Sequence, residues 1–541
     1  MSETSVTPGP SASLPKLTTG TLIAAVFACF VAQFGVSIPA TIQGYVNLDL
    51  HPTSTTLTWV SDAFMVPVTL FELSFGVFGD LFGRKRLLWI GGVLMIIGGM
   101  LGFLTPEGKI GILLVGQAVS GLGAAALFPT SIAMLAAGTH TVRDRAHSLS
   151  IWAAALTTGG FVSPVVGGVL ARISHSGGDY ASWRYAFLAE AILALASVLL
   201  TLALAQNSSS PHDRSLDWPG QITVAVGLFA LVFAVVQGAE DGWGSARVVG
   251  GFILAVVFLA IFVAVELRVE RPLIRLDLFA NRMFTVSAVV TVLAMFAYLG
   301  TAYATSIRIS AIQNYSPLYT SIAFVLLNIM GVILFPVSSR MLERFNPGWV
   351  LAGGAALIGI GDVLLAALPA NSHLGVAPIA IPLLIVGAGF KTAVTSITVV
   401  AVNSVPTAKA GMASGATSML RDLGLTMGPA IVAAIALTNA ANTIAGKLAA
   451  DPSLSQQVHA LPPDVQGVIA SGPLGANAIP NPPNPLQGIA FDALSHGYAL
   501  GYLVCGIAAL AGAVLAAVML GGRQHAHAFV TVEEAELAEP H

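Results

Sequence analysis

Residues 76–86 read GVFGDLFGRKR and decide how the rest of the sequence is interpreted. Gly76 and Gly79 carry no side chains, so they allow two helices to approach closely. Asp80 places a carboxylate at the predicted helix end, and Gly83 makes the turn. Three basic residues, 84–86, follow directly. Because such bases favour the cytoplasmic face of a membrane, we predict a short cytoplasmic hairpin between two membrane helices.

The composition favours a membrane protein independently of that stretch. Of the 541 residues, 55% are hydrophobic and only 9% are charged, with a mean hydropathy of +0.83, whereas a soluble globular chain has about 25% charged residues. The net charge of -3 indicates no particular partner. Cys29 and Cys505 both lie in apolar runs, so no disulfide or metal framework is expected. We predict neither a cofactor nor a nucleic-acid partner.

Fourteen apolar runs are long enough to cross a bilayer, which takes about 20 mostly apolar residues in a helix. They are approximately residues 19–42, 58–78, 86–104, 110–134, 147–171, 183–205, 218–238, 247–267, 284–307, 317–338, 348–368, 377–400, 412–438 and 495–520. The sequence therefore predicts an all-α polytopic protein in a lipid bilayer, with 14 transmembrane helices. Fifteen lysines and arginines fall on one side of this topology and six on the other, which places both termini in the cytoplasm.

Three pairs of stretches repeat in the same order along the chain. SGLGAAA (120–126) corresponds to VGAGFKT (386–392), GGFVSPVVGG (159–168) corresponds to GLTMGP (424–429), and SSRMLERFNPG (338–348) takes the place of the hairpin. Internal repeats of this kind are typical of secondary transporters. We predict two six-helix halves with two helices inserted between them.

This repeat divides the chain into five segments and one long outer loop. Residues 440–494 contain IPNPPNP, so we expect an irregular loop with a short helix near 453–470. The segments are a cytoplasmic tail (1–18), a first six-helix half (19–205), a linker with two inserted helices (206–283), a second six-helix half (284–520) and a cytoplasmic tail (521–541).

The G-x-x-G-D-x-x-G-R-K spacing of residues 76–85 resembles the signature loop between helices 2 and 3 of the major facilitator superfamily. The 6+2+6 arrangement is similar to the fourteen-helix drug:proton antiporter branch, as are TWVSDAF (58–64), SWRYAFL (182–188) and MASGATSMLRDLG (412–424). The resemblance implies the major facilitator fold and proton-coupled efflux of a lipophilic or amphipathic compound by alternating access. It also implies a monomer in a bacterial inner membrane.

Charged residues inside the predicted spans are the candidates for proton coupling or substrate binding. A charge in the bilayer core costs at least about 2.5–3.5 kcal/mol on insertion scales, so it must face protein or a water-filled cavity. The candidates are Asp62, Glu72, Glu190, Asp362, Lys391, Arg421 and Asp422.

Asp62 is the first candidate, because it lies about one turn into a helix that the resemblance places on the central cavity. Some relatives carry an Asp there that is associated with cationic substrates or protons. A carboxyl group in a poorly hydrated cavity can load and release a proton near neutral pH; the alternative is a residue that stays hydrated near the outer surface. Glu72 points about 80° away on the same helix. It is expected to pair with a base on a neighbouring helix or to face the cytoplasmic vestibule.

The other candidates have structural alternatives. Glu190 and Asp362 are more simply explained by pairing within the bundle. Lys391 replaces a small residue, and we expect it to pair with a carboxylate or to recognise an anionic group. Arg421 matches an Arg common in the family, so a structural or gating pair with Asp422 is the default.

The sequence also predicts a hinge and seal in helix 5. Its glycines and serine make a smooth packing face, and Pro164 loosens the local hydrogen bonds. The predicted gating residues are Gly160, Ser163, Pro164, Gly167 and Gly168 of this helix and Gly76, Asp80, Gly83 and Arg84 of the hairpin.

Two positions depart from the family pattern. Phe30 stands where the family has an Asp in helix 1, and Gln117 where it has an Arg in helix 4. Either Asp62 and Glu72 have taken over the coupling, or the protein exports a lipid, siderophore or metabolite, or it is an uncoupled facilitator. A membrane enzyme or receptor lacks support, and the absence of a G-x-x-x-x-G-K-[ST] stretch argues against an ATP-driven pump.

Overall fold

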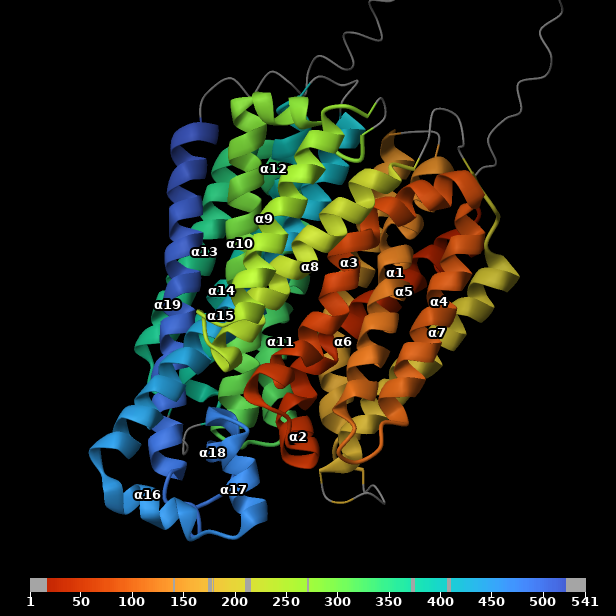
Figure 1. Cartoon of the computed structure of the whole chain (residues 1–541). Helices are drawn as coiled ribbons and strands as arrows, with labels where there is room; N and C mark the ends of the chain where they lie inside the picture. Colours follow the sequence, from red (N-terminus) through yellow and green to blue (C-terminus); the bar gives the residue numbers. More distant parts are fainter. Residues whose placement is uncertain are drawn as a thin grey trace, which may run out of the picture.

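The computed structural model describes residues 17–139, 142–173, 178, 180–209, 216–269, 272–370, 375–405 and 410–521. Within these residues every regular element is a helix, which confirms the predicted all-α class (Figure 1). Residues 1–16 and 522–541 of the predicted tails, and residues 210–215 of the polar linker 206–217, lie outside the described residues.

The long helices follow the predicted apolar runs. They are α1 (Thr19–Ser37), α2 (Pro39–Leu50), α3 (Ser54–Phe82), α4 (Arg84–Phe103), α5 (Ile110–Ala137), α6 (Val142–Leu170), α7 (Arg184–Leu204), α8 (Trp218–Asp241), α9 (Ala246–Glu266), α10 (Arg282–Ile307), α11 (Pro317–Ile333), α12 (Phe335–Arg344), α13 (Pro347–Ala367), α14 (Ala380–Asn403), α15 (Ala410–Ala450) and α19 (Gln487–Leu520). Short 3₁₀ turns occupy Ala181–Trp183, Leu276–Ala280 and Ala377–Ile379, and a π-helical turn, η3, occupies Arg308–Ile312.

Thirteen helices in the described part of the chain are long and apolar enough to cross a membrane. The one remaining predicted run, 317–338, is present as α11, which has only 17 residues because the chain turns at Leu334 and begins α12 with Pro336 in its first turn. The predicted count of 14 is therefore not confirmed by length and hydropathy.

The first predicted span, 19–42, is broken near its C-terminal end. Pro39 has no backbone N–H and ends α1, and α2 then continues as far as Leu50 rather than to residue 42. Asp49 at the end of α2 accepts hydrogen bonds from Trp183 Nε1 at 2.9 Å and from Arg184 Nη1 at 2.7 Å. The SWRYAFL stretch thus fixes α2 to the start of α7.

Backbone contacts at glycines match the predicted internal repeat. A Cβ at Gly121 of α5 would lie 2.1 Å from the backbone oxygen of Phe64 in α3, and a Cβ at Gly387 of α14 would lie 2.1 Å from that of Leu327 in α11. Only glycine permits such approaches. The first contact joins α5 to α3 within the first predicted half, and the second joins α14 to α11 within the second. These helix pairs are equivalent, and the sequence repeat aligns Gly121 with Gly387.

The second repeated pair shows the same agreement between α6 and α15. A Cβ at Gly159 would lie 2.6 Å from the Phe30 oxygen, and one at Gly424 would lie 2.6 Å from the Val292 oxygen. Four residues after Gly159 and Phe30, the Ser163 hydroxyl of α6 donates to the Phe34 oxygen of α1 at 2.7 Å. Gly159 and Gly424 align when Pro164 is placed on Pro429.

The inserted helix α8 packs against both α3 and α15, so it contacts one helix of each half. Gln221 Nε2 donates to the Leu70 oxygen at 2.6 Å, and Ser74 Oγ donates to Gln221 Oε1. Helix α9 packs on α8 and exposes most of its apolar side chains on the outside of the bundle, as Ile253 and Val256 do.

The predicted outer loop is shorter and more helical than expected. Helix α15 continues to Ala450, and three short helices follow, α16 (Pro452–His459), α17 (Pro463–Ala470) and α18 (Pro473–Ala478). The expectation of an irregular loop over all of 440–494 is therefore wrong, while the short helix expected near 453–470 is present as two, and IPNPPNP is non-helical. These three helices gather at one end of the bundle, the α16–α18 end (Figure 1). The turn between α3 and α4 lies at the opposite end.

Replacing Gly387 or Gly121 with alanine is expected to destabilise the protein by about 1–3 kcal/mol, the range for overpacking a tight contact. Gly353 of α13 is the matched control, because nothing lies within 4 Å of a Cβ placed there. Thermal unfolding of the purified protein should show a lower melting temperature for G387A and G121A than for G353A. Equal melting temperatures for all three variants would contradict the proposed packing.

Candidate functional site

A cavity of about 170 Å³ lies between the two halves. Its wall comes from α1, α3, α5 and α6 on one side and from α10, α11, α14 and α15 on the other. These are the first, second, fourth and fifth spans of each predicted half. Most of the lining is apolar, and its charged members among the described residues are Glu72, Lys391, Arg421 and Asp422.

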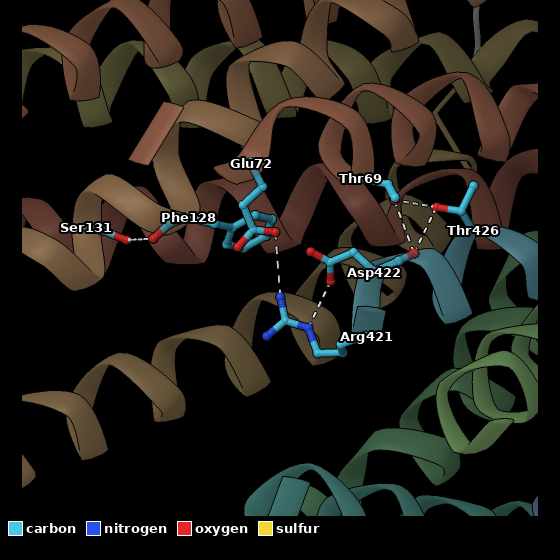
Figure 2. Close-up of polar contacts among 7 residues, drawn as sticks. All are labelled: Thr69, Glu72, Phe128, Ser131, Arg421, Asp422 and Thr426. Carbon is cyan, nitrogen blue, oxygen red and sulfur yellow. Dashed lines mark hydrogen bonds and ion pairs between the residues drawn. The ribbon is translucent and has the colours of Figure 1, made fainter. Parts of the chain in front are cut away.

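Three of these charged residues form one cluster. Arg421 Nε donates to Asp422 Oδ1 at 2.8 Å, and Arg421 Nη2 lies 3.7 Å from Glu72 Oε2 (Figure 2). The side chains of Glu72 and Asp422 are 8% and 4% exposed, whereas that of Arg421 is 29% exposed. The guanidinium therefore reaches the cavity while it holds two nearly buried carboxylates from different halves.

Hydrogen bonds beside the cluster fix α3 against α15. Thr69 Oγ1 donates to the Asp422 backbone oxygen at 3.1 Å and lies 2.6 Å from Thr426 Oγ1 (Figure 2). Because all three groups are buried, these bonds are shielded from water. The spacing between Glu72 and Asp422 is thus set by the contact between the halves.

An aromatic wall stands across α10 and α14. The rings of Tyr298 and Phe390 are stacked, with centroids 3.5 Å apart and planes 9° from parallel. Tyr298 Oη donates to Asn328 Oδ1 at 3.2 Å. Lys391 follows Phe390 directly and lines the same cavity. The wall offers a flat apolar face with a polar edge, which suits an amphipathic molecule.

Asp62 is on the same helix as Glu72 but does not line the cavity. It is fully buried, and neither of its carboxylate oxygens has a hydrogen-bond partner among the described residues. One turn earlier, Thr58 is hydrogen-bonded to Tyr303 of α10 at 2.9 Å. Asp62 therefore lies in the closed contact between the halves, on the α16–α18 side of the cavity.

Glu190 and Asp362 lie inside the separate halves and do not line the cavity. Asp362 Oδ1 accepts a hydrogen bond from Thr301 Oγ1 at 2.5 Å. Glu190 is fully buried, and a Cβ at Gly35 of α1 would lie 3.0 Å from its Oε1. Of the seven charged candidates, four meet at the cavity and three do not.

The two departures from the family pattern have different surroundings. Gln117 is buried and donates from Nε2 to the Val60 oxygen at 2.8 Å, so it ties α5 to α3. Phe30 packs with Phe27 and Phe34 along α1, with ring centroids 5.7 and 6.2 Å away. Neither residue lines the cavity.

The hairpin residues are held within the first half and its linker. Arg84 forms an ion pair with Asp80 at 2.7 Å, and its backbone N–H donates to the Ser208 oxygen at 2.9 Å. Gly83 has a φ of 99°, which favours glycine. A Cβ at Gly76 would lie 3.6 Å from Pro129, so the helix approach there is ordinary contact rather than the close approach expected.

The packing face predicted in the fifth apolar run, 147–171, lies on α6 and touches both halves. Gly160 lines the cavity, and a Cβ at Gly167 would lie 2.7 Å from Thr41 Oγ1. A Cβ at Gly168 would clash with Ser321 Oγ of α11, and that hydroxyl donates to the Pro164 oxygen at 2.6 Å. This packing closes the cavity toward the α16–α18 end.

Further contacts between the halves close the same end. Ser306 Oγ of α10 donates to Gln43 Oε1 of α2 at 3.0 Å. The backbone N–H of Leu474 in α18 donates to Ser54 Oγ of α3 at 3.2 Å.

Several uncharged lining residues were missed by the sequence reasoning, which followed charge. They are Gln33, Trp152, Tyr298, Asn328 and Phe390. Their signal was the presence of polar and aromatic side chains within otherwise aliphatic spans, but such residues also occur in packed cores.

The chain matches the family model described as Major Facilitator Superfamily over residues 24–429. It is 28% identical over 379 residues to the multidrug resistance protein Stp of Mycobacterium tuberculosis, covering 70% of this chain and 68% of that one. It is 23% identical over 506 residues to the tetracenomycin C resistance and export protein of Streptomyces glaucescens, covering 92% and 90%. A crystal structure of a POT family transporter in complex with 5-aminolevulinic acid has a similar fold, with a TM-score of 0.61, 13% identity and coverage of 94% and 98%.

Arg421→Gln is expected to destabilise the protein by about 1–3 kcal/mol, because it removes the hydrogen bond of the nearly buried Asp422 and the cation beside Glu72. A double-mutant cycle with Asp422→Asn isolates the pair, and we expect a coupling free energy of about 1 kcal/mol or more. Chemical or thermal unfolding of the four proteins measures it. A coupling near zero would show that the two side chains do not act as a pair.

Proposed function

Because the chain belongs to the major facilitator superfamily, a class of secondary transporters, we propose that it exports lipophilic or amphipathic compounds by alternating access. The cavity between the two halves carries this proposal. It is apolar and aromatic over most of its wall, and its four charged residues come from α3, α14 and α15. The names of the relatives Stp and the tetracenomycin C exporter support drug-like substrates.

We place the proton-coupling site at Glu72, Arg421 and Asp422. Two carboxylates share one guanidinium, so the cluster carries one negative charge in excess. Nearby like charges favour the binding of a proton by one member of such a pair. Protonation would weaken the contact that Arg421 makes between α3 and α15, which belong to opposite halves. Each proton that moves inward through 100 mV supplies about 2.3 kcal/mol.

The gating residues fit this scheme. The contacts at the α16–α18 end must break for the cavity to open there, and the hairpin with Asp80 and Arg84 stands at the opposite end. The tight face of Gly167 and Gly168 is the seal that would separate first, since small residues allow packed helices to slide. Asp62 lies inside that closing contact and is the alternative coupling site. We assign Glu190 and Asp362 structural roles within their halves.

The chain is a multi-pass membrane protein, as its apolar helices and its relatives show. We propose that it resides as a monomer in a bacterial inner membrane. The excess of lysine and arginine on the side of the α3–α4 turn supports a cytoplasmic position for that end. The α16–α18 end then faces outward, and the structure corresponds to a state closed toward the outside.

Glu72→Gln and Asp422→Asn are expected to slow proton-gradient-driven transport by about tenfold or more, equivalent to a barrier higher by about 1.4 kcal/mol, while exchange without a gradient continues. Reconstituted protein with an amphipathic dye and an imposed pH gradient provides the measurement. Asp451→Asn, at the exposed N-cap of α16, is the matched control.

Two other outcomes would change the account. If Asp62→Asn abolishes gradient-driven transport while the cavity variants retain it, coupling runs through Asp62. If a protonophore leaves transport by the parent unchanged, the protein is an uncoupled facilitator.

A further inference from the structure

The charged groups of the cavity are distributed unevenly. Both acidic residues on the described lining, Glu72 and Asp422, lie beside Arg421 on one side. Lys391 lines the cavity from α14, next to the aromatic wall. Lys391 is therefore the charged residue of the described lining that stands next to the aromatic wall.

Lys391 breaks the internal repeat at a position that the glycine contacts define. Gly121 and Gly387 make equivalent contacts, and the residues four places further on are Ala125 and Lys391. Ala125 is fully buried in the first half. The second half thus carries a long cation where the first half carries a methyl group, and packing does not require that cation.

The neighbouring residues form a site of two parts. Phe390 and Tyr298 present stacked rings, and Asn328 fixes the phenol of Tyr298. An apolar body can lie against this wall, while an ammonium forms charge-assisted hydrogen bonds with carboxylate or phosphate oxygens.

We propose that the cavity selects amphipathic molecules that carry an anionic group, a carboxylate or a phosphate, and that Lys391 binds this group. The proposal rests on the proposed function in one respect, namely that the cavity holds the transported compound. It also bears on energetics, since the inside-negative membrane potential itself drives an anion outward. Export of this class needs no competition between proton and substrate for one carboxylate.

Equilibrium binding of two matched dyes tests this selection. At neutral pH rhodamine B is a zwitterion with a free carboxylate on a cationic xanthene body, and its ethyl ester keeps that cationic body without the carboxylate. Fluorescence polarisation with purified protein gives both affinities for the parent, Lys391→Met and Lys391→Arg. Lys447→Met removes an exposed lysine far along α15 and controls for net charge.

We expect the parent and K447M to prefer rhodamine B. K391M should lose this preference by about tenfold or more, as for a lost hydrogen bond to a charged group, and K391R should largely keep it. Binding of the ester by K391M shows that its cavity is intact. A parent that prefers the ester, that binds neither dye, or whose preference survives in K391M would overturn the proposal.

Competition distinguishes the two sources of the anionic group. Octyl phosphate offers a single chain with a phosphate, and lysophosphatidylglycerol offers the phosphate within a lipid headgroup. Displacement of rhodamine B by both compounds in the parent, but by neither in K391M, supports recognition of the anion itself. Displacement by the lipid alone assigns the site to lysolipids. Displacement by octyl phosphate alone assigns it to small amphipathic acids. Displacement that is unchanged in K391M would contradict a role for Lys391. Binding needs no proton gradient, so these results stand apart from failure of proton coupling.

Discussion

The cost of placing charge inside an apolar bundle organises this structure. Each charge there needs a partner, a hydrogen bond or water, since insertion of an isolated one costs at least about 2.5–3.5 kcal/mol. Arg421 meets this need for two carboxylates at once, and those carboxylates come from opposite halves. The cluster therefore connects the electrostatics of the cavity to the contact between α3 and α15, and we propose that a change of protonation there alters how the halves fit together.

The glycine contacts supply the rigid framework in which that cluster can act. Gly121 and Gly387 bring helix backbones together within each half, at distances that leave no room for a side chain. Each half can then move as a body, since packed cores shift between discrete arrangements rather than deform continuously. The contacts that join the halves are of another kind. They are hydrogen bonds such as Ser306 to Gln43 and the packing of Gly168 on Ser321, which can be exchanged for water when the outer end opens.

The sequence predicted the helical class, the runs that become helices and the internal repeat, because hydropathy and glycine spacing are local properties. It located the buried charges but not their surroundings, since rotation about a helix axis separates Glu72 on the cavity from Asp62 in the closed contact. The predicted span ended at residue 438, whereas α15 continues to Ala450. Hydropathy falls after residue 438, but the alanine-rich stretch that follows still favours a helix. Tyr298 and Phe390 carried no charge to mark them, and their stacking depends on two helices far apart in the chain.

Distances between spin labels test the central claim, that two rigid halves alternate around the cavity. One pair of labels, at Glu107 and Ala377, reports on the end that holds α16–α18; a second pair, at Arg86 and Phe345, reports on the α3–α4 end, and the native Cys29 and Cys505 are buried. Acidic pH or bound substrate is expected to shift the two distances in opposite directions, with the pair at the α16–α18 end lengthening as the pair at the α3–α4 end shortens. Two distances that change together, or a shift confined to one end, would contradict it.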